Sequence, residues 1–550
     1  MTSDSPQDQA GGLSRLTVSE TLKNGQQSPD SSSPDRSARD VALSSSNTDD
    51  SGSRPEKPSN ASIASLDEII RRCRVLLSEL AEFQRHIKAQ YHARGENATD
   101  TFNAFSNCVK AEIKGLERLT GGHLPQAKVQ HAATSSNLPF LEAVWDATKC
   151  AQNVVAMMKI FYWDKQERNS ARNQHKGPHT TVDIVADGGL EWIKVSTITN
   201  TRLLFEKAKL GWEQGALSDE DDFSDRNADE SPAKNGSDDA ISIVKTARDL
   251  ARAAQAIRVS YKHPRIKYML PRIRPGQTSV IDEVLDDIRA AGVTVVCAED
   301  VPPAPPLDAA FSAMTGKRFV GFSDVINIDC TILLAIVSDF SHTAVKEEDW
   351  FHTALKTQIK AESKLQLMPS ILYPAMGSHA LVCTRAAAKR MHEIVDTIGT
   401  ESEKARTAIM MGTDASQTRQ QLVRDFRHHS IHEIPADWQL PIAVADEDTA
   451  AVATTRLPAV AQQVGRKLTP INQSVFLYGW ARGCTTITSN RTVVKQIEAV
   501  IDDATPASED AQGPMVWLCP TARSLVGKEK NRCTCGSTPC LRNAEYRCYR

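Results

Sequence analysis

The chain has 550 residues, enough for two or more domains that each bury a core of their own. A formal net charge of -3 excludes binding of polyanions through bulk charge, so any nucleic-acid contact must come from a local patch. No apolar run approaches the roughly 20 residues that span a bilayer, and the N-terminus resembles neither a secretory signal nor a transit peptide. The composition therefore indicates a protein of the cytoplasm or nucleus with no membrane partner. The scattered cysteines are typical of reduced, buried thiols.

The first part of the chain changes character near residue 60. Residues 1–60 are rich in Ser, Asp, Pro and Gln, and we expect them to form a disordered tail. Residues 61–302 are expected to form an N-terminal domain of helices and a small α/β part. Ser65 and Glu68 have the spacing of a capping box, and apolar residues then recur at helical spacing. Two further helical stripes follow, over residues 102–116 and 139–158.

Residues 180–196 change to the period of a β-hairpin around the turn at Asp187. Asp183, Glu191 and Lys194 loosely resemble the Asp…Glu-x-Lys arrangement of restriction-type nucleases. Their spacing places Glu191 and Lys194 on opposite faces of a strand, which favours a plain hairpin with Trp192 packed inward.

An acidic, Ser-rich insertion at residues 216–239 predicts a disordered loop that can contact protein partners. After it, a helix over residues 240–256 leads into a strand at 265–273, a helix at 280–291 and a strand at 292–298. This order predicts a βαβ unit, and the proline-rich residues 302–306 predict a linker.

A basic segment overlaps this unit and interleaves cations with tyrosines. Such a mixture suits single-stranded RNA, because cations neutralise phosphates while rings stack on bases. The alternative is an edge strand whose charges discourage aggregation. The candidate nucleic-acid-binding residues are Arg258, Lys262, Arg265, Lys267, Tyr268, Arg272 and Arg274.

Residues 307–530 are expected to form the second domain, organised around the run at 325–338. Residues 325–328 read as a buried strand, Asp329 follows at its carboxyl end, and residues 331–338 read as an apolar helix. Open α/β sheets present their binding sites at such strand ends. A buried aspartate is costly unless it is hydrogen-bonded, paired or bound to a metal, and the plainer alternative is that Asp329 only caps the helix.

The run at 325–338 resembles the first strand and helix of PIN-like nuclease domains. Together with residues 182–194, 394–399 and 475–490, it also resembles a eukaryotic family of uncharacterised proteins that have a PIN-like C-terminal half and a family-specific N-terminal half. The resemblance implies a doubly wound parallel sheet in the C-terminal half. Further strands at 380–383, 474–478, 485–488 and 515–518, alternating with helices, agree with such a sheet.

The resemblance also implies a catalytic site of carboxylates around one or two divalent cations, Mg²⁺ or Mn²⁺. Asp329 and Glu403 match two of the metal ligands, with Arg406 beside Glu403 as a candidate partner. Two positions depart from the pattern: Trp480 stands where family members can place an acid, and Asn490 stands where an active enzyme carries an aspartate. Asparagine ligates without adding charge. Asp339 is a candidate substitute acid or, more simply, a solvated helix end.

Two other groups have metal-ligating side chains. His428, His429 and His432 have no nearby cysteine that completes a tetrahedral set, which favours a solvated loop. The tail at residues 531–550 holds Cys533, Cys535, Cys540 and Cys548, spaced more tightly than usual zinc ligands, which favours a disordered tail.

The sequence thus supports two functions. One is a metal-dependent, PIN-like ribonuclease or an RNA-binding descendant with a degraded acidic site. The other is a protein-interaction scaffold in which the PIN-like sheet is purely structural. A nuclease requires Asp329, Glu403 and a third acid to converge within metal-ligand reach, whereas a scaffold does not.

Overall fold

The computed structural model describes residues 60–93, 101–120, 125–163, 178–218, 240–445, 457–506 and 508–527. Most of the predicted tail and acidic loop, and all of the cysteine-containing tail, lie outside these residues. The chain divides into two compact units, described separately below. Unit 1 is Met1–Val320 with Gln496–Gly513, and unit 2 is Gly321–Lys495 with Pro514–Arg550.

Unit 1 is built on a five-stranded sheet of order β1-β2-β3-β4-β5. The predicted hairpin is confirmed, because β2 and β3 pair antiparallel. The predicted βαβ unit is also confirmed, because β4 and β5 pair parallel across a helix, α8. The strands are β1 (Ala156–Tyr162), β2 (His179–Ala186), β3 (Glu191–Val195), β4 (Arg265–Leu270) and β5 (Thr294–Cys297).

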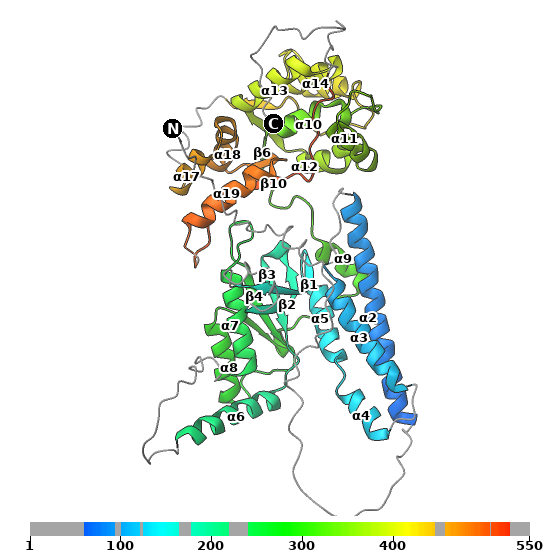
Figure 1. Ribbon diagram of the computed structural model, residues 1–550, viewed down its shortest axis with the longest axis vertical. Coiled ribbons are helices and arrows are strands. Elements are labelled where there is room, and N and C mark those ends of the chain that lie inside the picture. Colours follow the sequence, from blue (N-terminus) through cyan, green and yellow to red (C-terminus); the bar gives the residue numbers. More distant parts are fainter. Residues whose placement is uncertain are drawn as a thin grey trace, which may run out of the picture. The chain divides into compact units, whose positions relative to one another are not determined.

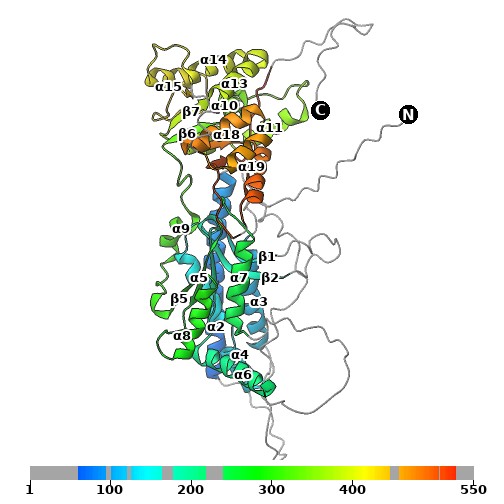
Figure 2. The same cartoon turned by 90° about the vertical axis from the view of Figure 1, so that its left-hand side faces the viewer.

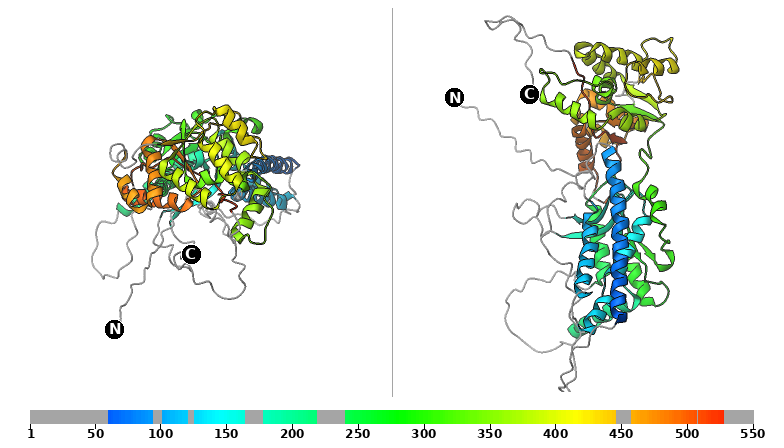
Figure 3. Two further views of the ribbon diagram at one scale, coloured as in Figure 1. Left: turned by 90° about the horizontal axis from the view of Figure 1, so that it is seen from above. Right: turned by 90° about the vertical axis from the view of Figure 1, so that its right-hand side faces the viewer.

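Helices cover both faces of this sheet, as the labels of Figures 1 and 2 show. One face packs against α2, drawn in blue along the length of the unit in Figure 3, together with α3, α5 and α9. The other face packs against α7 and α8, and Trp192 is buried there. The helices of unit 1 include α2 (Asn60–Ala93), α3 (Asn103–Thr120), α4 (Gln126–Thr134), α5 (Leu138–Cys150), α6 (Asn200–Ser218), α7 (Ser242–Gln255), α8 (Ser279–Ala290) and α9 (Leu307–Thr315).

Unit 2 contains a second five-stranded sheet, of order β10-β9-β6-β7-β8, in which every neighbouring pair is parallel. The first strand in sequence is therefore central, and the chain winds outward from it in both directions, as a doubly wound sheet requires. This confirms the predicted parallel sheet. The strands are β6 (Val325–Ile328), β7 (Ala380–Thr384), β8 (Ala443–Ala445), β9 (Thr485–Thr488) and β10 (Val516–Leu518).

Helices connect these parallel strands. Helix α18 lies against β6, β7 and β9, and Gly479 permits its close approach, since an added Cβ there would meet Thr486. The helices of unit 2 include α10 (Cys330–Val337), α11 (Thr353–Lys364), α12 (Tyr373–Met376), α13 (Arg385–Ile398), α14 (Glu401–Met411), α15 (Arg419–Arg427), α17 (Val460–Lys467), α18 (Pro470–Arg482) and the start of α19 (Arg491–Ala504).

Three sequence-based expectations about local structure are wrong. Residues 474–478 were expected to be a strand but lie inside α18, because a short apolar run has the same pattern in a buried helix as in a buried strand. Helix α2 begins at Asn60, so Ser65 does not cap it. The helical stripe expected to reach residue 158 ends at Cys150, and β1 follows.

Candidate functional site

Asp329 lies at the centre of the unit 2 sheet. It follows β6, which has β7 on one side and β9 on the other, so it stands where the winding of the sheet reverses. Ligands of open α/β sheets bind at this switch point, beyond the carboxyl ends of the strands. Only 2% of Asp329 is exposed, and its backbone amide donates to the Ile487 carbonyl of β9.

One oxygen of the Asp329 carboxylate, Oδ2, accepts hydrogen bonds from two threonines. The hydroxyl groups of Thr331 and Thr488 both donate to Oδ2, each at 2.7 Å. Asp329 occupies the N-cap position of α10, but its side chain makes no capping hydrogen bond. Burial raises the pKa of Asp329, and the hydroxyl groups of Thr331 and Thr488 together with the backbone amides of Cys330 and Thr331 oppose that rise only in part.

Asn490 lies beside this pair at the end of β9. Its backbone amide donates to Thr488 Oγ1 at 3.0 Å, and the amide of Ser489 donates to Thr331 Oγ1 at 3.2 Å. The side-chain Oδ1 of Asn490 accepts a bond from the amide of Val493 in the first turn of α19. The structure therefore brings Asp329 and Asn490 together through Thr488, while the Asn490 side chain itself caps a helix. We call Asp329, Thr331, Thr488, Ser489 and Asn490 the switch-point cluster.

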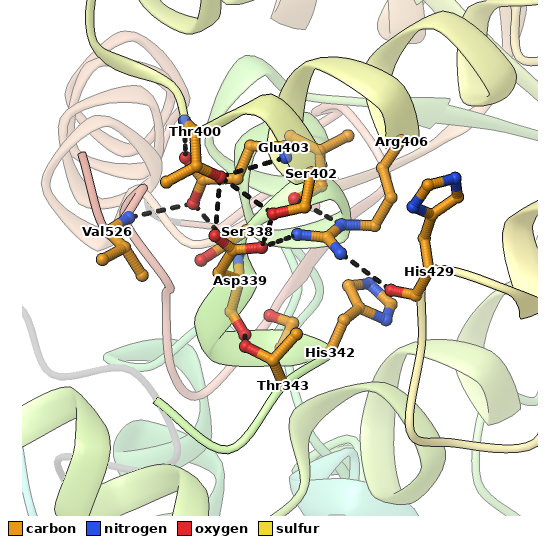
Figure 4. A network of polar contacts seen from close by, with 12 residues as sticks. Ser338, Asp339, His342, Thr343, Thr400, Ser402, Glu403, Arg406, His429 and Val526 are labelled. Carbon is orange, nitrogen blue, oxygen red and sulfur yellow. Dashed lines mark hydrogen bonds and ion pairs between the residues drawn. The ribbon is translucent and has the colours of Figure 1, made fainter. Parts of the chain in front are cut away.

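Glu403 belongs to a different network, shown in Figure 4. It is the N3 residue of a capping box that starts α14, in which Thr400 donates its amide to Glu403 Oε2. Glu403 Oε1 accepts from the amides of Asp339 and Val526, at 3.0 and 2.9 Å. Both carboxylate oxygens are thus engaged by backbone N–H groups. Burial raises the pKa of Glu403, and the three amides oppose the rise.

The expectation that Asp339 is a solvated helix end is wrong, because this residue is buried. Its carboxylate accepts hydrogen bonds from the Thr400 and Ser402 hydroxyl groups, each at 2.6 Å, and is ion-paired with Arg406. These donors outweigh desolvation and lower the pKa of Asp339. Arg406 therefore pairs with Asp339, whereas the sequence had placed it beside Glu403.

Arg406 is fully buried, and its other two nitrogen atoms also donate hydrogen bonds. Nε donates to the Val337 carbonyl at 2.8 Å. Nη1 donates to the His429 carbonyl at 2.7 Å, as Figure 4 shows. His342 lies beside this network, and burial together with the Arg406 charge lowers its pKa to about 3, so it is neutral. We call Asp339, Thr400, Ser402, Glu403 and Arg406 the arginine network.

The acids that resemble PIN ligands do not form a metal-binding set. Glu403 is held by amides in the arginine network, and Asp329 is held by hydroxyl groups in the switch-point cluster. Within the described ranges, no group of three or more His, Cys, Asp or Glu side chains is placed to hold a metal ion. Divalent cations need several carboxylate or carbonyl oxygens, so this donor set does not fit Mg²⁺ or Mn²⁺.

The predicted nucleic-acid segment is divided by the fold of unit 1. Arg258 is largely buried, donating to the Pro506 and Glu509 carbonyls and pairing with Asp502. Tyr268 is only 2% exposed and packs in the core, so its expected stacking on a base is wrong in this conformation. The alternating faces of β4 direct that ring inward.

The other cations of this segment lie nearer the surface. Arg265 pairs with Asp187 at 2.9 Å, and Lys267 pairs with Glu191 at 2.8 Å. Lys262, Arg272 and Arg274 are exposed. The segment therefore presents separate surface charges, with no accessible ring at Tyr268 between them.

The remaining candidates are the nuclease-like residues of the hairpin and the histidines of residues 428–432, and the contacts described here are within the fold. In the hairpin of unit 1, the buried Asp183 accepts from Lys194 Nζ at 3.0 Å and from the Val195 amide at 2.8 Å. Glu191 instead pairs with Lys267, so the three nuclease-like residues do not meet at one point. His429 contributes its carbonyl to Arg406, and burial lowers the pKa of His432.

Two family models match the chain. The family described as "Protein of unknown function (DUF1308)" matches residues 326–429, and the "Family of unknown function (DUF5614)" matches residues 74–202. The chain joins a DUF5614 region to a DUF1308 region. This agrees with the family-specific N-terminal half expected from the sequence. The DUF1308 match covers Asp329 and the whole arginine network and stops before Thr488 and Asn490.

No solved structure matches the chain at a significant level. Across the residues described, no helix has the length and apolar character needed to cross a membrane.

Sequence analysis missed the residues that surround the acids of unit 2. Thr331 and Thr488 supply the hydroxyl donors, and Thr331 was detectable as a hydroxyl residue two positions after the strand-end acid. The Asp339–Arg406 pair joins residues 67 apart in sequence, which no local pattern indicates.

Proposed function

We propose that unit 2, which contains the DUF1308 match, is a PIN-like domain that does not carry out metal-dependent hydrolysis and serves as a protein-interaction scaffold. The strand order, with the first strand central and Asp329 at its carboxyl end, supports the PIN-like part of this proposal. One observation carries the non-hydrolytic part: within the described ranges no second acid joins Asp329 in a metal-binding set, and Oδ2 of Asp329 is engaged by the hydroxyl groups of Thr331 and Thr488.

The chemistry follows from the donor set. Metal-dependent hydrolysis needs a cation that polarises the phosphate and lowers the pKa of water, and that cation needs several anionic ligands. Here the second acid, Glu403, is used to cap α14 and to hold two other backbone amides. Asn490 caps α19 and adds no charge. Glu403 and Asn490, which match positions of a PIN-like metal site, therefore stabilise helix ends of the fold.

Single-stranded RNA binding is the second candidate function. The exposed cations Lys262, Arg265 and Arg272 support it, since phosphate contacts alone supply much of nonspecific affinity. The internal pairing of Arg258 and the burial of Tyr268 favour the scaffold instead.

The deciding experiment is a cleavage assay on a labelled single-stranded RNA with the full-length protein in Mg²⁺ and in Mn²⁺. We expect no cleavage by the wild type, by Asp329→Asn or by Asn490→Asp. Metal-dependent cleavage by the wild type that Asp329→Asn abolishes would overturn the proposal. Cleavage gained only in Asn490→Asp would instead identify the single charge that the site lacks.

A further inference from the structure

The last described segment of the chain, residues 519–527, lies on unit 2 without belonging to a helix or a strand. We call it the strap. It follows β10, and the Cys519 amide still donates to the Thr488 carbonyl at the end of β9. Beyond that bond, the backbone groups of the strap described below are paired with side chains of unit 2.

Three side chains hold the strap backbone. The Gln358 side chain of α11 accepts from the Ser524 amide at 2.9 Å, and Ser338 donates its hydroxyl to the Ser524 carbonyl at 2.7 Å. Glu403 accepts from the Val526 amide at 2.9 Å, the contact at the left of Figure 4. Beyond Cys519 the strap can leave without breaking a sheet ladder, because each of these three bonds is to a side chain.

One strap side chain makes a buried ion pair. Arg523 is 2% exposed, and its Nη2 lies 2.7 Å from Oε2 of Glu362 on α11. Nε donates to the same oxygen at 2.8 Å, and the other Glu362 oxygen accepts from the Leu367 amide. Desolvation raises the pKa of Glu362, and the guanidinium opposes the rise. Without Arg523, this acid would remain largely buried with no counter-charge.

The strap also fills apolar space. Leu525, two residues after the arginine, is 5% exposed. Val526 packs against the cluster of Phe340, Phe351 and Leu355. Arg523 and Leu525 point inward while Ala522 and Ser524 are exposed, which is the alternation of an extended peptide read by side-chain pockets.

We infer that the strap occupies a peptide-binding site in cis, and that this site accepts a protein segment with an arginine followed two residues later by an apolar side chain. The inference rests on the proposed scaffold function and names its partner class. Leaving the buried Glu362 carboxylate without a counter-charge costs free energy. The strap is therefore exchanged only for a segment that supplies another guanidinium. Lysine is a poor substitute, since it lacks the planar fork that contacts carboxylates.

The test uses full-length protein carrying Arg523→Ala and Leu525→Ala, which weakens the strap, and a fluorescein-labelled peptide of residues 520–527. Anisotropy should show the peptide binding this variant at least about tenfold more tightly than the wild type, because the strap no longer competes. A peptide in which the arginine is replaced by alanine should lose about tenfold or more in affinity, as a buried charge-assisted bond is lost.

Matched acid substitutions locate the site. Glu362→Gln in the strap-weakened variant should abolish tight binding, whereas Glu347→Gln, which removes an exposed acid paired with Lys356, should leave it unchanged. A folded variant that does not bind the peptide, or binds the alanine peptide equally well, overturns the inference.

If the weakened variant does not fold, hydrogen exchange on the wild type decides. Saturating peptide should speed exchange of the Ser524 and Val526 amides, and unchanged exchange overturns the inference. Neither result depends on RNA cleavage, so failure of the peptide site and failure of the proposed function are distinguishable.

Discussion

The switch-point cluster and the arginine network both bury an aspartate in the same unit, but they stabilise it differently. Asp329 has two threonine hydroxyl donors to Oδ2 and no ion pair with any described residue, whereas Asp339 has an arginine and two hydroxyl groups. Burial consequently raises the pKa of Asp329, while the donors around Asp339 lower its pKa. An aspartate that has only neutral donors can be protonated without leaving a buried charge unpaired. An aspartate beside a buried guanidinium is stabilised in its ionised form.

The acid that matches a nuclease position is not the acid that carries the buried ion pair of unit 2. Asp329 stands where the resemblance places a metal ligand, yet its surroundings raise its pKa and supply only neutral donors to Oδ2. Asp339, a candidate substitute acid or solvated helix end in the sequence analysis, instead forms a buried ion pair with Arg406 of α14. The larger stability effects should therefore come from the arginine network.

The largest effect is expected for Arg406→Leu. This substitution leaves Asp339 buried without its counter-charge and removes the donors to the Val337 and His429 carbonyls. Breaking a buried pair in this way costs about 3–5 kcal/mol of unfolding free energy. Chemical denaturation of the full-length protein, followed through the transition of unit 2, measures the loss. A loss below about 1 kcal/mol would show that Asp339 does not depend on Arg406.

A smaller effect is expected at the switch point. Thr488→Val removes one hydroxyl donor while keeping the shape of the side chain, so Asp329 Oδ2 loses one of its two donors. Leaving a buried acceptor short of a partner costs about 1–3 kcal/mol. Thr488→Ser keeps the hydroxyl and serves as the control, with a smaller loss from the missing methyl group. Equal losses in the two variants would mean that the hydroxyl does not stabilise Asp329.

Asp329→Asn and Asp339→Asn should show opposite pH dependence. The folded pKa of Asp329 is raised, so its stabilising contribution is complete below its ordinary value of 3.8 and declines as pH rises through the folded pKa. Asparagine does not titrate, so Asp329→Asn should gain stability relative to the wild type as pH rises above 3.8.

The folded pKa of Asp339 is lowered, so its contribution is present above 3.8 and is lost as pH falls through the folded pKa. The loss caused by Asp339→Asn should therefore be largest at neutral pH and shrink in acid. Denaturation midpoints across this range decide the matter. Parallel curves for the two variants would contradict the distinction between the sites.

The sequence was sufficient to locate the switch point but not to determine its chemistry. Residues 325–338 predicted β6 and α10 because a buried strand, a polar strand end and an apolar helix are all local signals. The same local signals failed at residues 474–478, where tertiary burial makes a helix as apolar as a strand. Thr488 beside Asp329, Arg406 beside Asp339 and Glu362 beside Arg523 come from distant parts of the chain, and no local period encodes such pairings.

The smallest effect is expected from the surface cations of unit 1. Replacing Lys262, Arg265 and Lys267 together by alanine removes exposed or paired charges, each worth less than about 1 kcal/mol. We expect unfolding to change little and RNA binding to remain weak at low salt. If these residues bind RNA, the slope of log K against log salt should fall by about 0.7 for each lost contact. A drop of that size would favour RNA binding over the scaffold.

Metal-dependent melting tests the central claim most directly, because it asks whether Asp329 is a metal ligand or a hydroxyl-bound acid. A metal that binds the folded state at about 100 times its Kd adds about 2.7 kcal/mol of stability. Our account predicts that Mg²⁺ and Mn²⁺ leave the melting temperatures of the wild type and Asp329→Asn unchanged, with the apo stabilities of the two within about 1 kcal/mol at neutral pH. A rise in wild-type melting temperature that Asp329→Asn abolishes would contradict it.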